Sequence, residues 1–366
     1  MKKSLLALAV LGAFANTAFA QTSVSIYGIV DAGVNFDNGK EAGGRQWSLA
    51  SGQQSSSRIG FKGTEALGGG LSASFTLENG FSADTGALGN GSRLFGRQAW
   101  VGLDGGFGSV KLGRQYSTIY NALNAIDPFG VNQAGDMQRV YAYGLGKLDP
   151  IARSDNTITY SSPNFGGFSA SVGYKFGETA GAFNTNSSKF AGVGYANGPL
   201  NVVFAYQNTD AVGFTTAATS AGGLTTSAGL SVAALPAVVG LGATTADVKT
   251  AFLGGTYDFG VVKAHLGFGD TKLEAVGDSK IRNYMVGVTA PLGANSVYAS
   301  WNRNDVRDIR EGTSDQYAIG YSHPISKRTN FYTSIGYTKN DSNVRLNASG
   351  NGGNDREFQA GVRHLF

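Results

Sequence analysis

The chain has 366 residues, with 29 Lys and Arg against 25 Asp and Glu and a formal net charge of +4. So small a positive excess gives no argument for nucleic-acid binding, and the absence of cysteine excludes a disulfide framework and thiol chemistry. With 55 glycines, 7 prolines and 11% aromatic residues, the composition is not that of a disordered chain.

Residues 1–20 have the pattern of a secretory signal peptide. Two lysines at positions 2 and 3 precede an apolar run over residues 5–14, and Ala18-Phe19-Ala20 matches a small-x-small cleavage site. The apolar run is too short for a membrane helix. We therefore expect residues 1–20 to be cleaved and residues 21–366 to form one domain.

From residue 23 onward apolar residues alternate with small or polar ones, which is typical of strands with one apolar face. In the last strand this apolar face consists of Phe358, Ala360, Val362, His364 and Phe366. The alternation predicts sixteen strands, over residues 23–36, 45–65, 70–81, 93–104, 108–116, 153–162, 167–177, 187–197, 199–208, 248–258, 260–270, 280–291, 293–304, 313–323, 328–341 and 353–366.

Short and long connections alternate along the chain. The short ones lie at residues 104–108, 163–167, 197–199, 259–260, 291–294 and 323–327. The long ones lie at residues 80–92, 116–152, 178–186, 209–247, 271–279 and 343–352. Short turns on one rim and long loops on the other are typical of outer-membrane barrels. The predicted fold is therefore all-β, a transmembrane antiparallel 16-stranded β-barrel.

A soluble β-sandwich is the alternative, since it also shows period-two patterning. Three features count against it: the secretion signal, the even strand number with asymmetric loops, and a polar face rich in Gly, Ser and Lys. That face has few large apolar residues that could fill a second core. We therefore favour the barrel.

The segment 116–152 interrupts the alternation. A connection this long is usually functional or disordered, and this one carries apolar residues, among them Leu123, Ile126 and Phe129. We predict that it folds into the barrel lumen as a constriction loop, with these three residues as its anchors. The Ala/Thr/Gly/Ser-rich segment 209–247 is expected to be an exposed external loop without chemistry.

Several segments together resemble the general porins of Gram-negative bacteria, and the last resembles the β-proteobacterial members. They are Ser25-Ile26-Tyr27-Gly28, Ser57-Arg58-Ile59-Gly60-Phe61-Lys62-Gly63, Arg97-Gln98-Ala99-Trp100-Val101-Gly102-Leu103, Phe107-Gly108-Ser109-Val110-Lys111-Leu112-Gly113-Arg114-Gln115, Arg153-Ser154-Asp155-Asn156 and Gly361-Val362-Arg363-His364-Leu365-Phe366. The resemblance extends over the whole mature chain, and its motifs are specific only in combination.

The resemblance implies a homotrimer in the Gram-negative outer membrane, with the third external loop folded inward and passive diffusion of small hydrophilic solutes and ions. It implies outer-membrane lipid, lipopolysaccharide and the barrel-assembly machinery as partners. Phe366, with His364 two residues earlier, is similar to the family's assembly signal. One departure is that the family loop often has Pro-Glu-Phe-Gly-Gly, where this chain has Asp127-Pro128-Phe129-Gly130-Val131.

Residue parity places four basic side chains on the inward face: Arg58, Lys62, Arg97 and Arg153. Arg97 is assigned inward because it lies opposite Trp100, although Gln98 shares the face of Trp100. We expect Asp127 and Asp136 on the loop to face the arginines, because walls of charged side chains set ion selectivity. The alternative is that these are ordinary solvated lumen charges.

Inward cations outnumber inward acids once Lys175 and Lys263 are included, and this predicts a preference for anions. Arg114 shares parity with Leu112 and should point outward near the end of its strand. A lone arginine in lipid is costly, so we expect either snorkelling to the interface or a subunit contact.

Enzymatic functions find no support in the sequence. Only three histidines are present, and His265, the one on the predicted lumen face, has no accompanying nucleophile motif. Neither a metal-ligand cluster nor a phosphate loop is visible, so no metal or cofactor is predicted. The predicted function is a general diffusion porin that prefers anions. The alternatives are a channel selective for a sugar, organic acid or phosphate, and an outer-membrane hydrolase.

Overall fold

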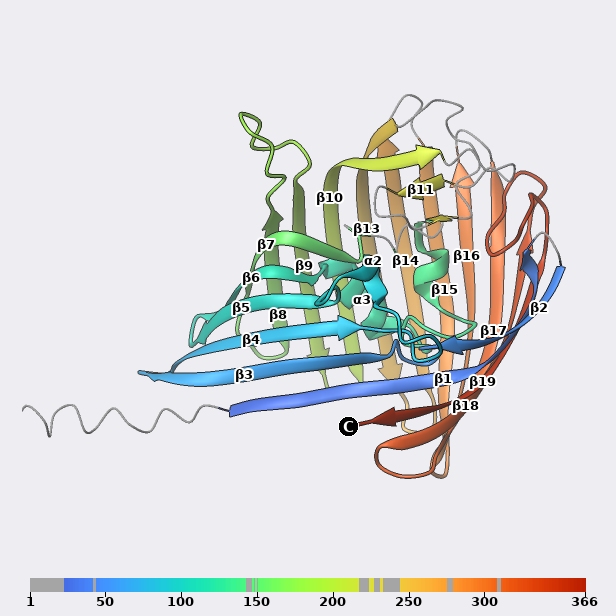
Figure 1. Cartoon of the computed structure of the whole chain (residues 1–366), viewed down its shortest axis with the longest axis horizontal. Helices are drawn as coiled ribbons and strands as arrows, with labels where there is room; N and C mark the ends of the chain where they lie inside the picture. Colours follow the sequence, from blue (N-terminus) through green and yellow to red (C-terminus); the bar gives the residue numbers. More distant parts are fainter. Residues whose placement is uncertain are drawn as a thin grey trace, which may run out of the picture.

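In the computed structural model a single antiparallel sheet closes on itself (Figure 1). The structure describes residues 23–41, 44–142, 147, 149, 151–216, 224–226, 231–232, 244–274, 279–307 and 311–366. The predicted signal peptide, residues 1–20, lies outside these ranges and stays a prediction. None of the helices within them is both long and apolar enough to cross a bilayer.

The strands are β1 (Ser23–Glu41), β2 (Gly44–Ser51), β3 (Arg58–Gly68), β4 (Leu71–Gly80), β5 (Gln98–Gly105), β6 (Gly108–Tyr116), β7 (Arg153–Ser161), β8 (Phe168–Lys175), β9 (Ser188–Asn197), β10 (Leu200–Thr216), β11 (Leu224–Thr226), β12 (Ser231–Val232), β13 (Thr244–Asp258), β14 (Lys263–Glu274), β15 (Ser279–Leu292), β16 (Asn295–Arg307), β17 (Gly312–Pro324), β18 (Thr329–Asn340) and β19 (Asp355–Leu365). The helices are α2 (Gly89–Ser92), α3 (Thr118–Ile126) and α4 (Met137–Val140). With β2 and β3 counted as one wall strand, and β11 and β12 as part of a long loop, the wall has the predicted sixteen strands.

Closure is made by β1, which pairs with β19 along one edge and with β2 and β3 along the other. At the chain terminus Gly28 and Phe366 exchange two backbone hydrogen bonds, of 3.0 and 3.1 Å. The sheet therefore has no open edge between its first and last strands.

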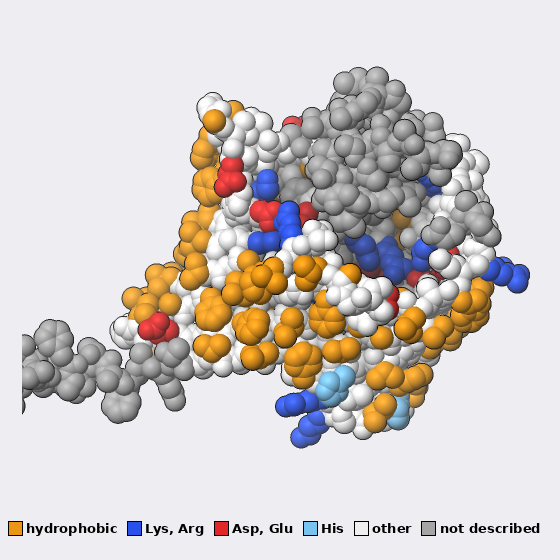
Figure 2. All heavy atoms as spheres, in the orientation of Figure 1, with side chains coloured by type: hydrophobic (Ala, Val, Ile, Leu, Met, Phe, Trp, Pro, Cys, Tyr) orange, Lys and Arg blue, Asp and Glu red, His pale blue; other side chains and the backbone are white. Residues whose placement is uncertain are grey.

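Apolar side chains of each strand are exposed on the outer face, and polar or small ones face inward. Figure 2 shows hydrophobic side chains over the outer face of the front strands and charged side chains gathered at the opening above them. Leu253, Leu266 and Ile319 are each more than half exposed, whereas His265 and Gln316 on the inner face are buried. An apolar exterior around a polar interior is the inverse of a soluble sandwich.

The wall strand predicted at 45–65 is broken. Residues 52–57 leave the ladder and form a turn, because the Asp31 carboxylate accepts hydrogen bonds from the backbone N–H groups of Gln54 and Ser55, at 2.9 and 2.6 Å. A buried carboxylate that draws two neighbouring amides toward itself competes directly with strand pairing. Beyond the turn, β3 resumes pairing with β1.

The predicted external loop 209–247 is shorter than expected, because β10 continues to Thr216 and β13 begins at Thr244. These extensions pair with each other across a register shift between Thr209 and Val212. Residues 217–223, 227–230 and 233–243 of this loop lie outside the described part of the chain.

Candidate functional site

The described residues of the segment between β6 and β7 lie inside the ring of strands (Figure 1). Its first part is α3, which was not predicted. Ser117 caps the helix by accepting a hydrogen bond from the Tyr120 N–H at 3.0 Å. Ile119, Leu123 and Ile126 form a stripe at helical spacing, and all three are fully buried. The helix therefore packs one apolar face against the wall.

The three predicted anchors contact inward side chains of the wall. Leu123 and Ile126 belong to a cluster that includes Phe252 of β13. The ring of Phe129 packs edge-on against Tyr298 of β16, with centroids 4.8 Å apart. These contacts hold the loop against one half of the barrel.

Polar contacts fix the same loop along its length. His265 Nδ1 lies 2.7 Å from the Ile126 carbonyl oxygen, and the N–H of Ala142 donates to Asn283 Oδ1 at 2.9 Å. The hydroxyl group of Tyr141 donates to the Ala251 carbonyl oxygen at 3.0 Å. His265, the histidine considered above for catalysis, thus positions the loop.

Opposite the loop, Arg58, Arg97 and Arg153 come together from three strand ends. Arg58 begins β3, Arg97 directly precedes β5, and Arg153 begins β7. Arg97 Nε donates to Glu78 Oε1 at 2.7 Å, and Arg58 Nη1 lies 4.0 Å from the same oxygen. Glu78 therefore neutralises part of this positive charge and holds two arginines close together.

Arg153 is held differently. Its guanidinium carbon lies 4.8 Å from the ring centroid of Tyr116 and 5.5 Å from that of Tyr120. The two rings stack on each other, 4.2 Å apart. Within the described ranges Arg153 forms no ion pair with a carboxylate, although the residue is only 9% exposed. Cation–π contacts of this kind retain the full positive charge of the guanidinium group.

A cavity of about 250 Å³ separates this basic wall from the loop. Arg97 and Arg153 line it from the wall, and Gln138, Asn132 and Lys147 line it from the loop. Lys62, the fourth predicted cation, lies nearer the short-turn rim. Its Nζ is 5.2 Å from the Tyr27 ring centroid.

Asp127 does not face the arginines, contrary to the expectation from sequence. Its Oδ1 accepts from the Phe129 N–H at 3.0 Å, and its Oδ2 accepts from the N–H groups of Val131 and Met137, both at 2.9 Å. Burial, followed by repulsion from Asp136, raises the pKa of Asp127 to about 7. The side chain therefore stabilises the loop's own fold.

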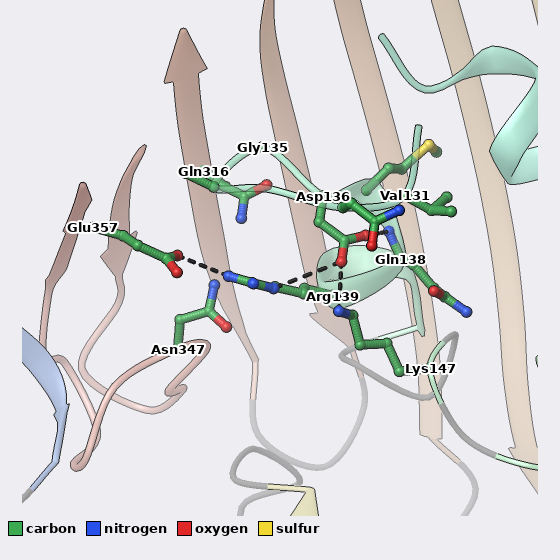
Figure 3. Close-up of polar contacts among 12 residues, drawn as sticks. Val131, Gly135, Asp136, Gln138, Arg139, Lys147, Gln316, Asn347 and Glu357 are labelled. Atoms are coloured by element: carbon green, nitrogen blue, oxygen red, sulfur yellow. Dashed lines mark hydrogen bonds and ion pairs between the residues drawn. The ribbon is translucent and has the colours of Figure 1, made fainter. Parts of the chain in front are cut away.

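Asp136 has partners within the loop rather than on the arginine wall, and Figure 3 shows it beside Arg139 and Lys147. It caps α4 by accepting from the Gln138 N–H, and it forms ion pairs with Lys147 at 2.5 Å and Arg139 at 3.6 Å. Arg139 in turn reaches Glu357 of β19 at 2.7 Å. The loop thus presents its own cations, Arg139 and Lys147, which sequence reasoning did not select.

Replacing Asp127 by Asn should loosen the loop. The amide has one acceptor oxygen, so at least one of the three backbone donors loses its partner, at a local cost of about 1–3 kcal/mol. We expect backbone amides around residues 129–137 to exchange hydrogen at least about fivefold faster. Asp84→Asn, at an exposed position in another loop, is the matched control. Equal exchange in both variants would contradict this role.

Arg114 is not the lone outward arginine predicted from parity. Its Nη2 lies 2.5 Å from Asp149, its Nη1 lies 2.7 Å from Asp155, and its Nε donates to the Gly96 carbonyl oxygen at 2.7 Å. These partners satisfy the charge within the chain. The subunit contact predicted for this residue stays a prediction.

Comparisons with known proteins agree on one family. The model described as Gram-negative porin matches residues 7–343. Outer membrane porin protein 32 of Delftia acidovorans is 36% identical over 384 residues, covering 100% of both chains. An outer membrane porin protein of Bordetella pertussis is 33% identical over 394 residues, covering 93% of this chain and 95% of its own length. A solved anion-selective porin from Comamonas acidovorans aligns with a TM-score of 0.77 at 31% identity, covering 94% of this chain and 100% of that chain.

Proposed function

We propose that this chain, which belongs to the Gram-negative porin family of non-enzymatic outer-membrane channels, forms a pore that prefers anions. As a general porin it carries small hydrophilic solutes and ions down their gradients through a water-filled lumen. The loop between β6 and β7 sets the narrowest cross-section, between its own polar residues and the arginine wall.

The observation that carries this proposal is the distribution of charge around the 250 Å³ cavity. Arg97, Arg153 and Lys147 line it. Glu78 pairs with Arg97 and Asp136 pairs with Lys147, whereas Arg153 contacts aromatic rings and no carboxylate among the described residues, and Asp127 is turned into the loop. A wall of fixed cations stabilises a partly dehydrated anion and repels a cation. The effect weakens at high salt, where the screening length falls to about 3 Å at 1 M.

Swelling of proteoliposomes separates general diffusion from a solute-specific channel. For a general pore, rates for uncharged sugars should fall smoothly with molecular size, without saturation or mutual competition. Anionic solutes should enter faster than cationic ones of equal size. One sugar, organic acid or phosphate that enters out of proportion to its size, and competes with its analogues, would favour the specific channel instead.

We further propose that three chains associate in the membrane, as the family resemblance implies. A folded assembly of this kind resists dissociation by detergent until it is heated. The molar mass of the purified protein, measured by light scattering with the detergent contribution subtracted, tests this directly. A monomer at all concentrations would contradict it.

Deleting Phe366 should block assembly rather than conduction. The deletion removes both backbone hydrogen bonds to Gly28 and the aromatic ring that lies over that glycine. Unpaired backbone groups in lipid cost several kcal/mol each. We expect little heat-resistant protein in the outer membrane. Phe366→Ala keeps the backbone bonds and isolates the ring's contribution. Normal amounts of folded, heat-resistant truncated protein would contradict the prediction.

A further inference from the structure

The turn at residues 52–57 contains more chain than the ladder can accommodate. On either side of it, Ser51 pairs with Ala32 and Arg58 pairs with Ile29. The six residues of the turn therefore lie opposite only two residues of β1. They are one glycine, two glutamines and three serines, so none of them supplies the apolar side chain that a lipid-facing position requires. The surplus chain is therefore directed into the lumen.

Asp31 of β1 holds this turn in place with both its side chain and its main chain. Besides the two turn amides that its carboxylate accepts, its Oδ1 accepts from the hydroxyl group of Tyr332 at 2.5 Å. Its carbonyl oxygen accepts from the Gly52 N–H at 2.7 Å and from the Ser57 hydroxyl group at 3.0 Å. Asp31 is fully buried, so these contacts, and not solvent, satisfy its polar atoms.

The turn contacts both sides of the constriction. Toward the arginine wall, the Ser56 carbonyl oxygen accepts from Arg58 Nε at 2.9 Å. Toward the loop between β6 and β7, the Gln53 carbonyl oxygen accepts from the Gln133 N–H at 2.7 Å. Ser56 and Ser57 line the same 250 Å³ cavity as Arg97 and Arg153. The turn thus lies between the arginines and the tip of the loop, and it bonds to each.

On the basis of the proposed function, in which the loop sets the narrowest cross-section, we propose that the turn at residues 52–57 is the second wall of this constriction and that Asp31 is the residue that positions it. Without the carboxylate, two turn amides and the Tyr332 hydroxyl group lose their partner, and the turn is released from β1. The Gln53 carbonyl oxygen then no longer fixes the loop tip, and the Ser56 carbonyl oxygen no longer fixes Arg58. The pore becomes wider at its narrowest point.

A single introduced thiol tests whether the turn lines the narrow section, because the chain has no cysteine of its own. Ser56→Cys should react with neutral benzyl methanethiosulfonate and then lose about half or more of its single-channel conductance, since the added ring fills part of the pore. Ser326→Cys, exposed in a short turn, is the matched control and should keep its conductance. Failure of the Ser56→Cys thiol to react, or unchanged conductance after modification verified by mass spectrometry, would overturn the proposal.

The same variant separates this proposal from the preference for anions. Anionic sulfonatoethyl and cationic trimethylammonioethyl methanethiosulfonate are compared at Ser56→Cys, each relative to its rate with a small free thiol. A preference for anions predicts that the anionic reagent reacts faster. Equal relative rates with a conductance lowered by the benzyl group would contradict the anion preference alone. A faster anionic reagent with a conductance unchanged by the benzyl group would contradict the second wall alone.

Variants of Asp31 test its positioning role. Asp31→Ala removes the acceptor and should raise single-channel conductance by about 1.5-fold or more, together with the solute size limit. Asp31→Asn keeps an oxygen that can accept from both turn amides, so its conductance should stay within about 20% of the wild type. If the charge of Asp31 were what matters, both variants would change conductance equally. Equal changes, or no change in Asp31→Ala, would therefore contradict the positioning role.

A variant that keeps every charge gives the same test where Asp31→Ala fails to fold. Gly52 has a φ of +69°, and a Cβ there would lie 2.7 Å from the Ser56 Cα. Gly52→Ala should therefore displace the turn and raise conductance as Asp31→Ala does. Gly69→Ala is the matched control, since Gly69 also has a positive φ, of +60°, but has open space around it. Equal conductance in the two glycine variants would contradict the proposal.

Discussion

Removal of residues 122–135 should leave a folded barrel with larger single-channel conductance and a larger solute size limit. The wall strands pair with one another and with no residue of this segment, so closure does not depend on it. The segment instead contacts the wall through side chains, such as Phe129 on Tyr298, and through the hydrogen bond from the Gln133 N–H to the Gln53 carbonyl oxygen at 2.7 Å. Planar-bilayer recording and proteoliposome swelling measure the two effects.

The deletion also uncovers apolar residues on the inner face, such as Phe252 and Met285. Some loss of stability is therefore expected, and detergent melting curves should be compared with those of a second deletion. Removing residues 179–185, in the exposed β8–β9 loop, is a suitable control that should leave conductance unchanged. If deletion of 122–135 also leaves conductance and size limit unchanged, the loop does not form the constriction.

Neutralising the arginine wall should abolish the preference for anions. Arg153→Gln alone should lower the anion-to-cation permeability ratio by about three- to sevenfold, the effect of one unit charge about 7 Å from the ion in water. Arg153 is the cleanest single position because aromatic rings, and no carboxylate among the described residues, hold it. Replacing Arg58, Arg97 and Arg153 together should reverse selectivity, since Glu78 would then lack its arginine partners.

A matched control is needed because a substitution in the arginine wall can also destabilise the fold. Arg97 and Glu78 form a buried pair, and removing one partner of such a pair costs about 3–5 kcal/mol. The double variant Arg97→Gln with Glu78→Gln avoids an unpaired buried charge. Arg356→Gln, at an outer-face position beside Tyr337, should leave selectivity as in the wild type. Selectivity that is insensitive to Arg153→Gln would contradict the proposed role of the wall.

Period-two alternation predicted the strands, because it follows directly from strand geometry, while the secretion signal, the asymmetric loops and the polar face were needed to choose the barrel over a sandwich. It could not show the break at residues 52–57, which depends on Asp31, a residue distant in sequence from that turn. Alternation alone also does not identify which face of a strand lines the barrel lumen. Trp100 was taken as lipid-facing, but its Nε1 donates to Gln98 at 3.1 Å, and both residues line a lumen cavity.

Strand parity predicted that all three arginines point inward, although it applies strictly only to Arg58. Arg58 is inward by parity, as expected. Arg97 precedes the first residue of β5, so strand parity does not apply to it, and its inward position follows from its ion pair with Glu78. Arg153 was assigned to the face of Thr157 by parity, which holds only in an unbroken strand. The pairing of β7 with β6 shifts register between Gly113 and Gln115, so parity does not connect these two residues. Glu78 was overlooked although it shares the inward parity of Ser74 and Thr76.

The loop was the hardest part to predict. The helix α3 had a readable signal, a serine cap followed by apolar residues at positions 119, 123 and 126. No signal in the sequence indicated the orientation of Asp127, because its three backbone donors come together only when the loop is folded. The same holds for Arg139, whose partner Glu357 lies on the last strand.

The reversal potential of the wild-type pore under a potassium chloride gradient tests the central claim most directly. At moderate salt, about 0.1 M on the dilute side, the account predicts the sign of a chloride-preferring pore, with a magnitude that shrinks as both solutions approach 1 M. A potential near zero at every salt concentration, or one with the sign of potassium preference, would contradict it.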